Sequence, residues 1–96
     1  MKEVLLVKSE NKQKVEDLLK RDDIVSRGSI TIKSPSSLDI DEEGYFFILD
    51  MRESSIERAE ELTKELAQKY KDGKKVIHKV EEEEDRAIEG FGNILG

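Results

Sequence analysis

Cysteine and tryptophan are missing from this chain, there is a single proline, and no long apolar run occurs. Without cysteine the protein has no disulfide framework, no thiolate nucleophile and no cysteine-bound zinc or iron–sulfur site. The apolar run near the N-terminus, residues 4–7, has only four residues, whereas a membrane-spanning helix needs about 20. We therefore expect a soluble, cytoplasmic protein that has no membrane partner.

Charge is abundant instead, and it is unevenly distributed. Charged residues make up 42% of the 96 positions, against about 25% in typical domains, a bias that is common in thermophile proteins. Two segments, 39–54 and 81–96, each carry six acidic and one basic side chain, while the remaining segments are slightly basic. A chain of this length forms one domain. We assign it to residues 1–80, followed by an acidic spacer and an apolar tail over 81–96.

Four segments have the pattern of β-strands. Residues 3–8 and 45–51 are apolar at consecutive positions, which is typical of strands covered on both faces. Residues 29–33 alternate between polar and apolar, which predicts an edge strand, and residues 75–80 alternate less regularly as a last edge strand. The sequence therefore predicts two central strands and two edge strands.

Two segments have helical spacing. Val15, Leu18 and Leu19 form one apolar stripe after Ser9, which can cap a helix. A second stripe extends from Ile56 to Tyr70, behind a capping box that begins at Ser54. The order β-α-β-β-α-β indicates an α+β fold of the ferredoxin-like kind: an antiparallel four-stranded sheet in the order 4-1-3-2 with two helices on one face.

The second face of such a sheet would be apolar and uncovered. Exposed apolar surfaces of this size usually bind something, so we expect either a second copy of the chain or the C-terminal tail to cover it. The expected anchors are Phe91, Ile94 and Leu95 of the tail, and the expected receiving residues on the sheet are Tyr45 and Phe47. The glycines at 90, 92 and 96 predict a short helix and an irregular hook in place of a long helix.

An acidic loop is the second candidate site. Asp39, Asp41, Glu43 and Gly44 read D-x-D-x-E-G, and Asp50 occupies the twelfth position, so the loop resembles an EF-hand calcium loop over these twelve residues. It differs in its shorter twelfth ligand, in the proline and serines before it, and in the strand pattern that follows. The sequence therefore predicts no true EF-hand, but a looser Ca²⁺ or Mg²⁺ site of oxygen ligands.

Other chemistry has little support. His78 is the only histidine, and we expect it to be a half-buried residue of the last strand. An enzyme would have to use carboxylates such as Asp50 or Glu53, and no partner residue is identifiable for them. Strand 3–8 carries no aromatic residue on which bases could stack, and the acidic segments would repel phosphates, so we expect no nucleic-acid binding.

These observations favour a non-catalytic interaction module, regulatory or assembly, that acts by self-association or by binding a protein partner. The alternative is a small-ligand or divalent-cation module that uses the loop at 39–50. A small carboxylate enzyme is a further alternative.

Overall fold

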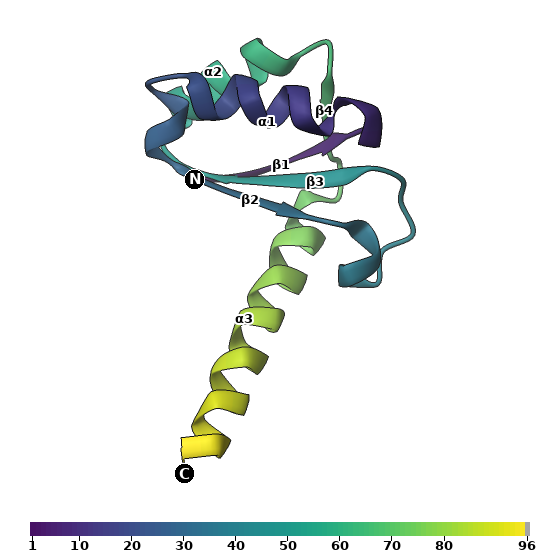
Figure 1. Cartoon of the computed structure of the whole chain (residues 1–96), viewed down its shortest axis with the longest axis vertical. Coiled ribbons are helices and arrows are strands. Elements are labelled where there is room, and N and C mark those ends of the chain that lie inside the picture. Colours follow the sequence, from purple (N-terminus) through teal and green to yellow (C-terminus); the bar gives the residue numbers. More distant parts are fainter. Residues whose placement is uncertain (96) are drawn as a thin grey trace.

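The computed structural model describes residues 1–95, and from residue 85 onward it describes the backbone alone. One four-stranded sheet is flanked by two helices on one face and by a long third helix on the other (Figure 1). The elements are β1 Lys2–Val7, α1 Lys12–Arg21, β2 Ser29–Lys33, β3 Tyr45–Asp50, α2 Glu53–Thr63, β4 Ala67–Lys69 and α3 Gly73–Leu95.

The sheet confirms the expected fold class. Its order is β2-β3-β1-β4, which is the predicted order 4-1-3-2 read from the other edge, and all neighbouring strands are antiparallel. β1 and β3 lie in the centre, with Leu5 opposite Phe47 and Val4 opposite Ile48. The two strands with continuous apolar sequence are thus the two that have neighbours on both sides.

The fourth strand is a different segment from the one predicted. Residues 75–80 belong to α3, and β4 is the short segment Ala67–Lys69, which pairs with Leu5–Val7 of β1. The predicted helix over 54–70 is wrong in its second half, because α2 ends at Thr63. The Thr63 hydroxyl donates a hydrogen bond to the Ala59 carbonyl at 2.8 Å, a local bond that competes with regular helix geometry.

The start of α2 also differs from the expected capping box. The helix begins at Glu53, so Ser54 lies in its first turn, and the residue at the cap position is Arg52, whose side chain makes no capping hydrogen bond. Arg52, Ser54 and Ser55 at this end of α2 line a cavity.

One core lies between the sheet and the pair α1 and α2. It is built from the sheet residues that alternate toward this face, together with apolar residues of both helices. Its fully buried members include Leu5, Val7, Val15, Leu19, Val25, Phe47, Leu49, Ile56 and Ala59. This layer corresponds to the helix-covered face that the sequence predicts.

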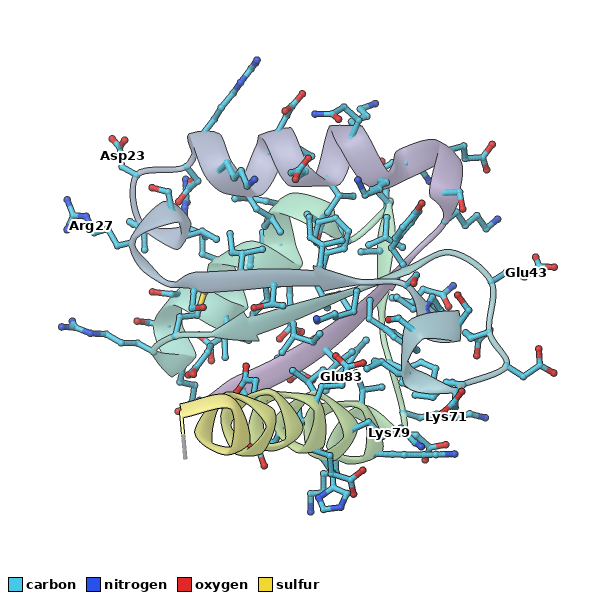
Figure 2. The ribbon with its side chains drawn as sticks, turned by 60° about the horizontal axis from the view of Figure 1, so that its bottom comes forward. Asp23, Arg27, Glu43, Lys71, Lys79 and Glu83 are labelled. Carbon is cyan, nitrogen blue, oxygen red and sulfur yellow. The ribbon has the colours of Figure 1, made fainter. Side chains whose placement is uncertain are left out.

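A second core covers the opposite face of the sheet. Val76 and Val80 of α3 pack with Val4, Phe46 and Ile48, and Leu38 and Ile40 complete the cluster from the segment between β2 and β3. The Phe46 ring also lies 4.8 Å from that of Tyr70. Figure 2 shows α3 beneath the sheet, on the side away from α1. The chain thus covers its second face with its own third helix.

This helix is also longer than expected. α3 continues to Leu95 and passes through Gly90 and Gly92, so the predicted short helix and irregular hook are wrong at the level of the backbone. Its second half leads away from the sheet and ends at the point farthest from the rest of the molecule (Figure 1). Among the described residues, no helix combines the length and the apolar character that crossing a bilayer requires.

Candidate interaction surface

The first half of α3 is fixed to the sheet by apolar contacts and by ion pairs at its border. Val76 is fully buried and Val80 is 8% exposed. The Lys2 ammonium lies 3.1 Å from the Glu81 carboxylate, and the Lys33 ammonium lies 3.3 Å from that of Glu83. The hydrogen bond and the charge of Glu81 together raise the pKa of Lys2. These contacts mark the end of the attached half.

The second half of α3, residues 85–95, repeats the apolar pattern of the first. Val76, Ile77 and Val80 recur as Ala87, Ile88 and Phe91, each displaced by 11 residues. Three turns of an α-helix take 10.8 residues, so the two sets occupy the same side of the helix. Because the first set packs against the sheet, the second set continues the sheet-facing stripe into the part that leads away from it. We call this continuation the distal stripe: Ala87, Ile88, Phe91, Ile94 and Leu95.

Acidic residues stand between the two halves. The run from Glu81 to Asp85 follows the attached half directly. Two of its members form the ion pairs with Lys2 and Lys33. The His78 Nε2 atom lies 2.9 Å from the Glu82 Oε1 atom. The run is therefore part of a helix that contacts its own domain.

The predicted receiving residues lie on the other face of the sheet. Phe47 is fully buried beneath α1 and α2, and Tyr45 is half-buried with the Lys12 ammonium 5.1 Å from its ring centre. Neither residue belongs to the face that α3 crosses, because Phe46 and Ile48 occupy it. The tail residues Phe91, Ile94 and Leu95 lie on the α3 backbone, and their side chains are outside the described part of the structure.

The acidic loop does not gather its predicted ligands. Asp39 takes a left-handed conformation, with φ of 56°, at the end of the short helix Pro35–Leu38, and Asp41 and Glu43 are exposed. Asp50 ends β3, about 17 Å along the strand from Tyr45 at the usual rise per residue. Within the described residues, no three acidic or histidine side chains come close enough to hold an ion. The Ca²⁺ or Mg²⁺ site stays a prediction from the sequence.

His78 is not a strand residue. It lies on α3 with its side chain 72% exposed, next to Glu82 one turn further along the helix. The alternation of residues 75–80 thus gave the wrong environment for this side chain.

Comparison of the chain with protein-family models, with curated proteins and with solved structures finds no match.

Proposed function

We propose that this protein is a non-catalytic assembly module in which the distal stripe of α3 pairs with the same stripe of a second copy. The observation that supports this most directly is the 11-residue recurrence along one helix. The stripe that packs against the sheet continues over three further turns, where no part of the described chain lies beside it.

The distal half of α3 needs a partner to be a stable helix. The attached half nucleates the helix, but each further residue beyond it depends on its own helix propensity and on burial. Gly90 and Gly92 each lower helix stability by about 1 kcal/mol relative to alanine. The helix extends over this segment nevertheless, and burial of an apolar face is what usually stabilises such a helix.

The negative charge of residues 81–96 determines whether two copies would pair in a parallel or an antiparallel arrangement. Residues 81–96 carry six acidic and one basic side chain, so two such segments repel each other. A parallel pair in register would bring the two runs at 81–85 to within about 10 Å, the usual distance between packed helices. An antiparallel pair centred on Phe91 would place them about 24 Å apart, which is several Debye lengths at physiological salt. We therefore propose the antiparallel arrangement.

The interface is small, and the expected association is correspondingly weak. Two segments of this length bury less than the roughly 1,200 Å² that stable complexes bury at the least. We expect a reversible dimer that dissociates in the micromolar range or above. Raising the salt concentration from about 0.01 M toward physiological strength should strengthen it, because the repulsion between the acidic segments is then screened. A basic groove on an unrelated protein would show the opposite dependence on salt.

Sedimentation equilibrium of the full chain, from about 10 μM to 1 mM, tests the proposal. We expect the apparent molar mass to rise toward twice the monomer value, and Phe91→Ala to abolish this rise. Asn93→Ala is the matched control, because position 93 lies outside the stripe. A chain ending at Asp85 should stay monomeric and keep the stability of the full chain measured at low concentration. A monomeric full chain at every concentration would refute the proposal.

A further inference from the structure

Four lysines are concentrated at the start of α3, on the sides of the helix that the sheet leaves uncovered. They are Lys71, in the turn before the helix, and Lys74, Lys75 and Lys79 in its first two turns. The first three are exposed, and Lys79 is half-buried at the border of the group. Figure 2 shows Lys71 and Lys79 on the same side of the molecule. We call these four residues the basic face.

The basic face has no acidic partner in the described part of the chain. The ion pairs of α3 described above use the acidic residues 81–83, and none of them includes one of these four lysines. Residues 71–79 contain four lysines and a single acidic residue, Asp72, so this segment has a net charge of +3 on a chain whose net charge is −6. The many carboxylates of the chain therefore leave this positive charge unpaired.

The stability of α3 does not account for lysines at this position. The first turn of a helix carries the positive end of the helix dipole, where acidic side chains are favourable and basic ones are unfavourable. The first turn of α3 contains no acidic residue, and Lys74 and Lys75 lie within it. Their charge lowers the stability of the helix, so an anionic partner explains these two lysines better than a structural role does.

The basic face is short and has acidic residues at both ends. The acidic run 81–85 begins two residues after Lys79, which already shares a shallow hollow with three acidic side chains. At the other end, burial raises the pKa of Tyr70, and the charge of the neighbouring Glu42 raises it further, so a carboxylate lies beside the residue that precedes Lys71. At the helical rise per residue, the basic face extends over about 12 Å.

This length distinguishes between classes of anionic partner. Duplex nucleic acid carries one charge about every 1.7 Å over many base pairs, and a bilayer is a continuous charged surface. Either would also meet the acidic run next to the basic face. An extended peptide spans about 13 Å with four residues, so a short acidic segment matches the basic face. The acidic run of a second copy fits less well, because Glu81 and Glu83 are paired with lysines of their own chain.

We infer that the basic face binds a short acidic segment of another protein, about four residues long, whose carboxylates form ion pairs with the lysines. The distal stripe continues the sheet-facing side of α3, whereas the basic face lies on its uncovered sides. Binding of the acidic segment is therefore independent of the pairing proposed above. Because each exposed ion pair contributes little, we expect a dissociation constant on the order of 1 mM for a simple acidic peptide.

Titration of the ¹⁵N-labelled full chain with acetylated and amidated hexaglutamate, at about 0.02 M salt, tests this inference. We expect saturable shifts of the Lys71, Lys74 and Lys75 amides, and loss of binding at about 0.5 M salt. Shifts that do not saturate would overturn the inference. Tighter binding of a thymidine heptanucleotide, which carries the same number of charges, or sedimentation with phosphatidylserine vesicles, would assign the basic face to a different partner and would also overturn it.

A double variant and a matched control separate a specific surface from a general effect of charge. Lys74→Gln combined with Lys75→Gln should weaken binding of hexaglutamate about fivefold or more. Because this variant removes positive charge from the start of a helix, its midpoint of thermal unfolding should equal or exceed that of the natural chain, which excludes unfolding as the cause. Lys14→Gln combined with Arg21→Gln removes two exposed charges from α1, across the sheet from α3, and should change the affinity less than about twofold. Equal weakening by the two double variants would refute the inference.

Discussion

The packing of α3 on the second face of the sheet leads to a definite prediction for Val76→Ala. Val76 is fully buried among Val4, Phe46 and Ile48, so the substitution removes two methyl groups from a closed core. Their transfer is worth about 1.6 kcal/mol, and the residual cavity adds to this. The higher helix propensity of alanine returns about 0.5 kcal/mol. We expect a net loss of about 1.5 kcal/mol in the free energy of unfolding.

Urea unfolding followed by circular dichroism measures this loss, and thermal unfolding should show a decrease of about 6–12 °C in the midpoint. Lys75→Ala is the matched control, since it lies one residue earlier on the exposed side of the same helix and should change stability by less than about 0.5 kcal/mol. The measurements should be made at a protein concentration of a few micromolar, where association through the distal stripe contributes little to the free energy of unfolding. An unchanged unfolding midpoint for Val76→Ala would show that α3 does not cover the sheet.

Two further substitutions test other parts of the fold. Gly44→Ala should lower the free energy of unfolding by about 2 kcal/mol or more, because Gly44 has φ of 99° and a Cβ there would lie 2.2 Å from the Val7 carbonyl oxygen. Gly73→Ala, whose Cβ would meet Val4 at an ordinary 3.5 Å, should be neutral or slightly stabilising in the same urea experiment. The pKa of Asp22 is lowered, first by the hydrogen bond from the Val25 amide at 3.0 Å and further by the Arg58 guanidinium at 2.8 Å. Its stabilising effect is therefore present above the unfolded pKa of about 3.9 and is lost as the pH falls through the lower folded value. Asp22→Asn should accordingly be less stable than the natural chain at pH 6 and should approach it at about pH 3, and a constant difference across this range would contradict the assigned pKa shift.

The central part of the fold can be predicted from the sequence because the local propensity and the apolar periodicity of each strand favour the same structure. β1 and β3 are the two segments with continuous apolar residues, and such segments are stable only with cover on both faces. β2 alternates and lies at an edge, with Ile30 and Ile32 facing the core under α1 and α2. In each case local propensity, periodicity and position in the sheet agree.

The sequence of the C-terminal third is ambiguous because the spacing of its apolar residues fits both a strand and a helix. Val76 and Val80 share a face in a strand, where alternate residues align, and also in a helix, where residues four apart align. The decisive residue is Ile77, which falls on the wrong face of a strand but lies one helical turn from Val80, in the same stripe, on a helix. The short strand Ala67–Lys69 carries almost no apolar signal, since two of its three residues are exposed, and its pairing with β1 is set by tertiary structure.

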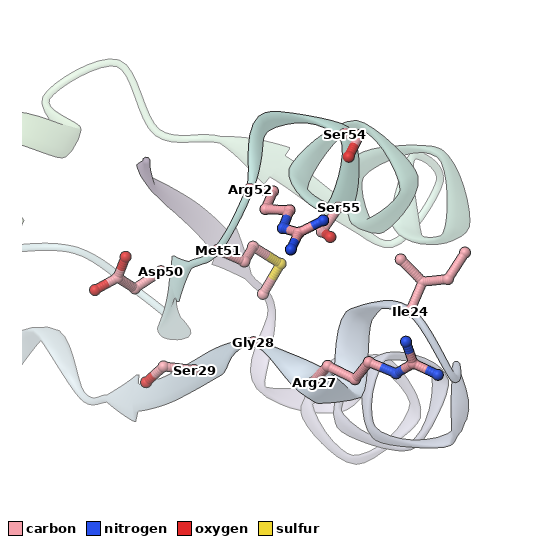
Figure 3. Close-up of a pocket in the computed structure, with 9 residues that line it drawn as sticks. All are labelled: Ile24, Arg27, Gly28, Ser29, Asp50, Met51, Arg52, Ser54 and Ser55. Carbon is pink, nitrogen blue, oxygen red and sulfur yellow. The ribbon is translucent and has the colours of Figure 1, made fainter.

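The cavity at the start of α2 could not be predicted because its parts are distant in sequence and individually ordinary. Arg27 belongs to a turn, Arg52 to a connection and Ser55 to a helix, and only the pairing of Ser29 with Asp50 brings these segments together (Figure 3). The sequence alone does not show why position 28 is glycine. The reason is the Met51 side chain, which leaves no room for a Cβ atom there.

Because α3 covers the second face of the sheet, that face gives no support for the association of two copies. From sequence, two apolar strand faces and one layer of helices imply an exposed patch, and the patch implies a partner. The structure resolves this mismatch within a single chain, because Val76 and Val80 already occupy the face in question. The support for a second copy therefore lies on the helix, where the same stripe continues from Ala87 to Leu95, beyond the ion pairs of Glu81 and Glu83. A substitution on the sheet face should accordingly alter stability alone, whereas a substitution in the distal stripe should alter association alone.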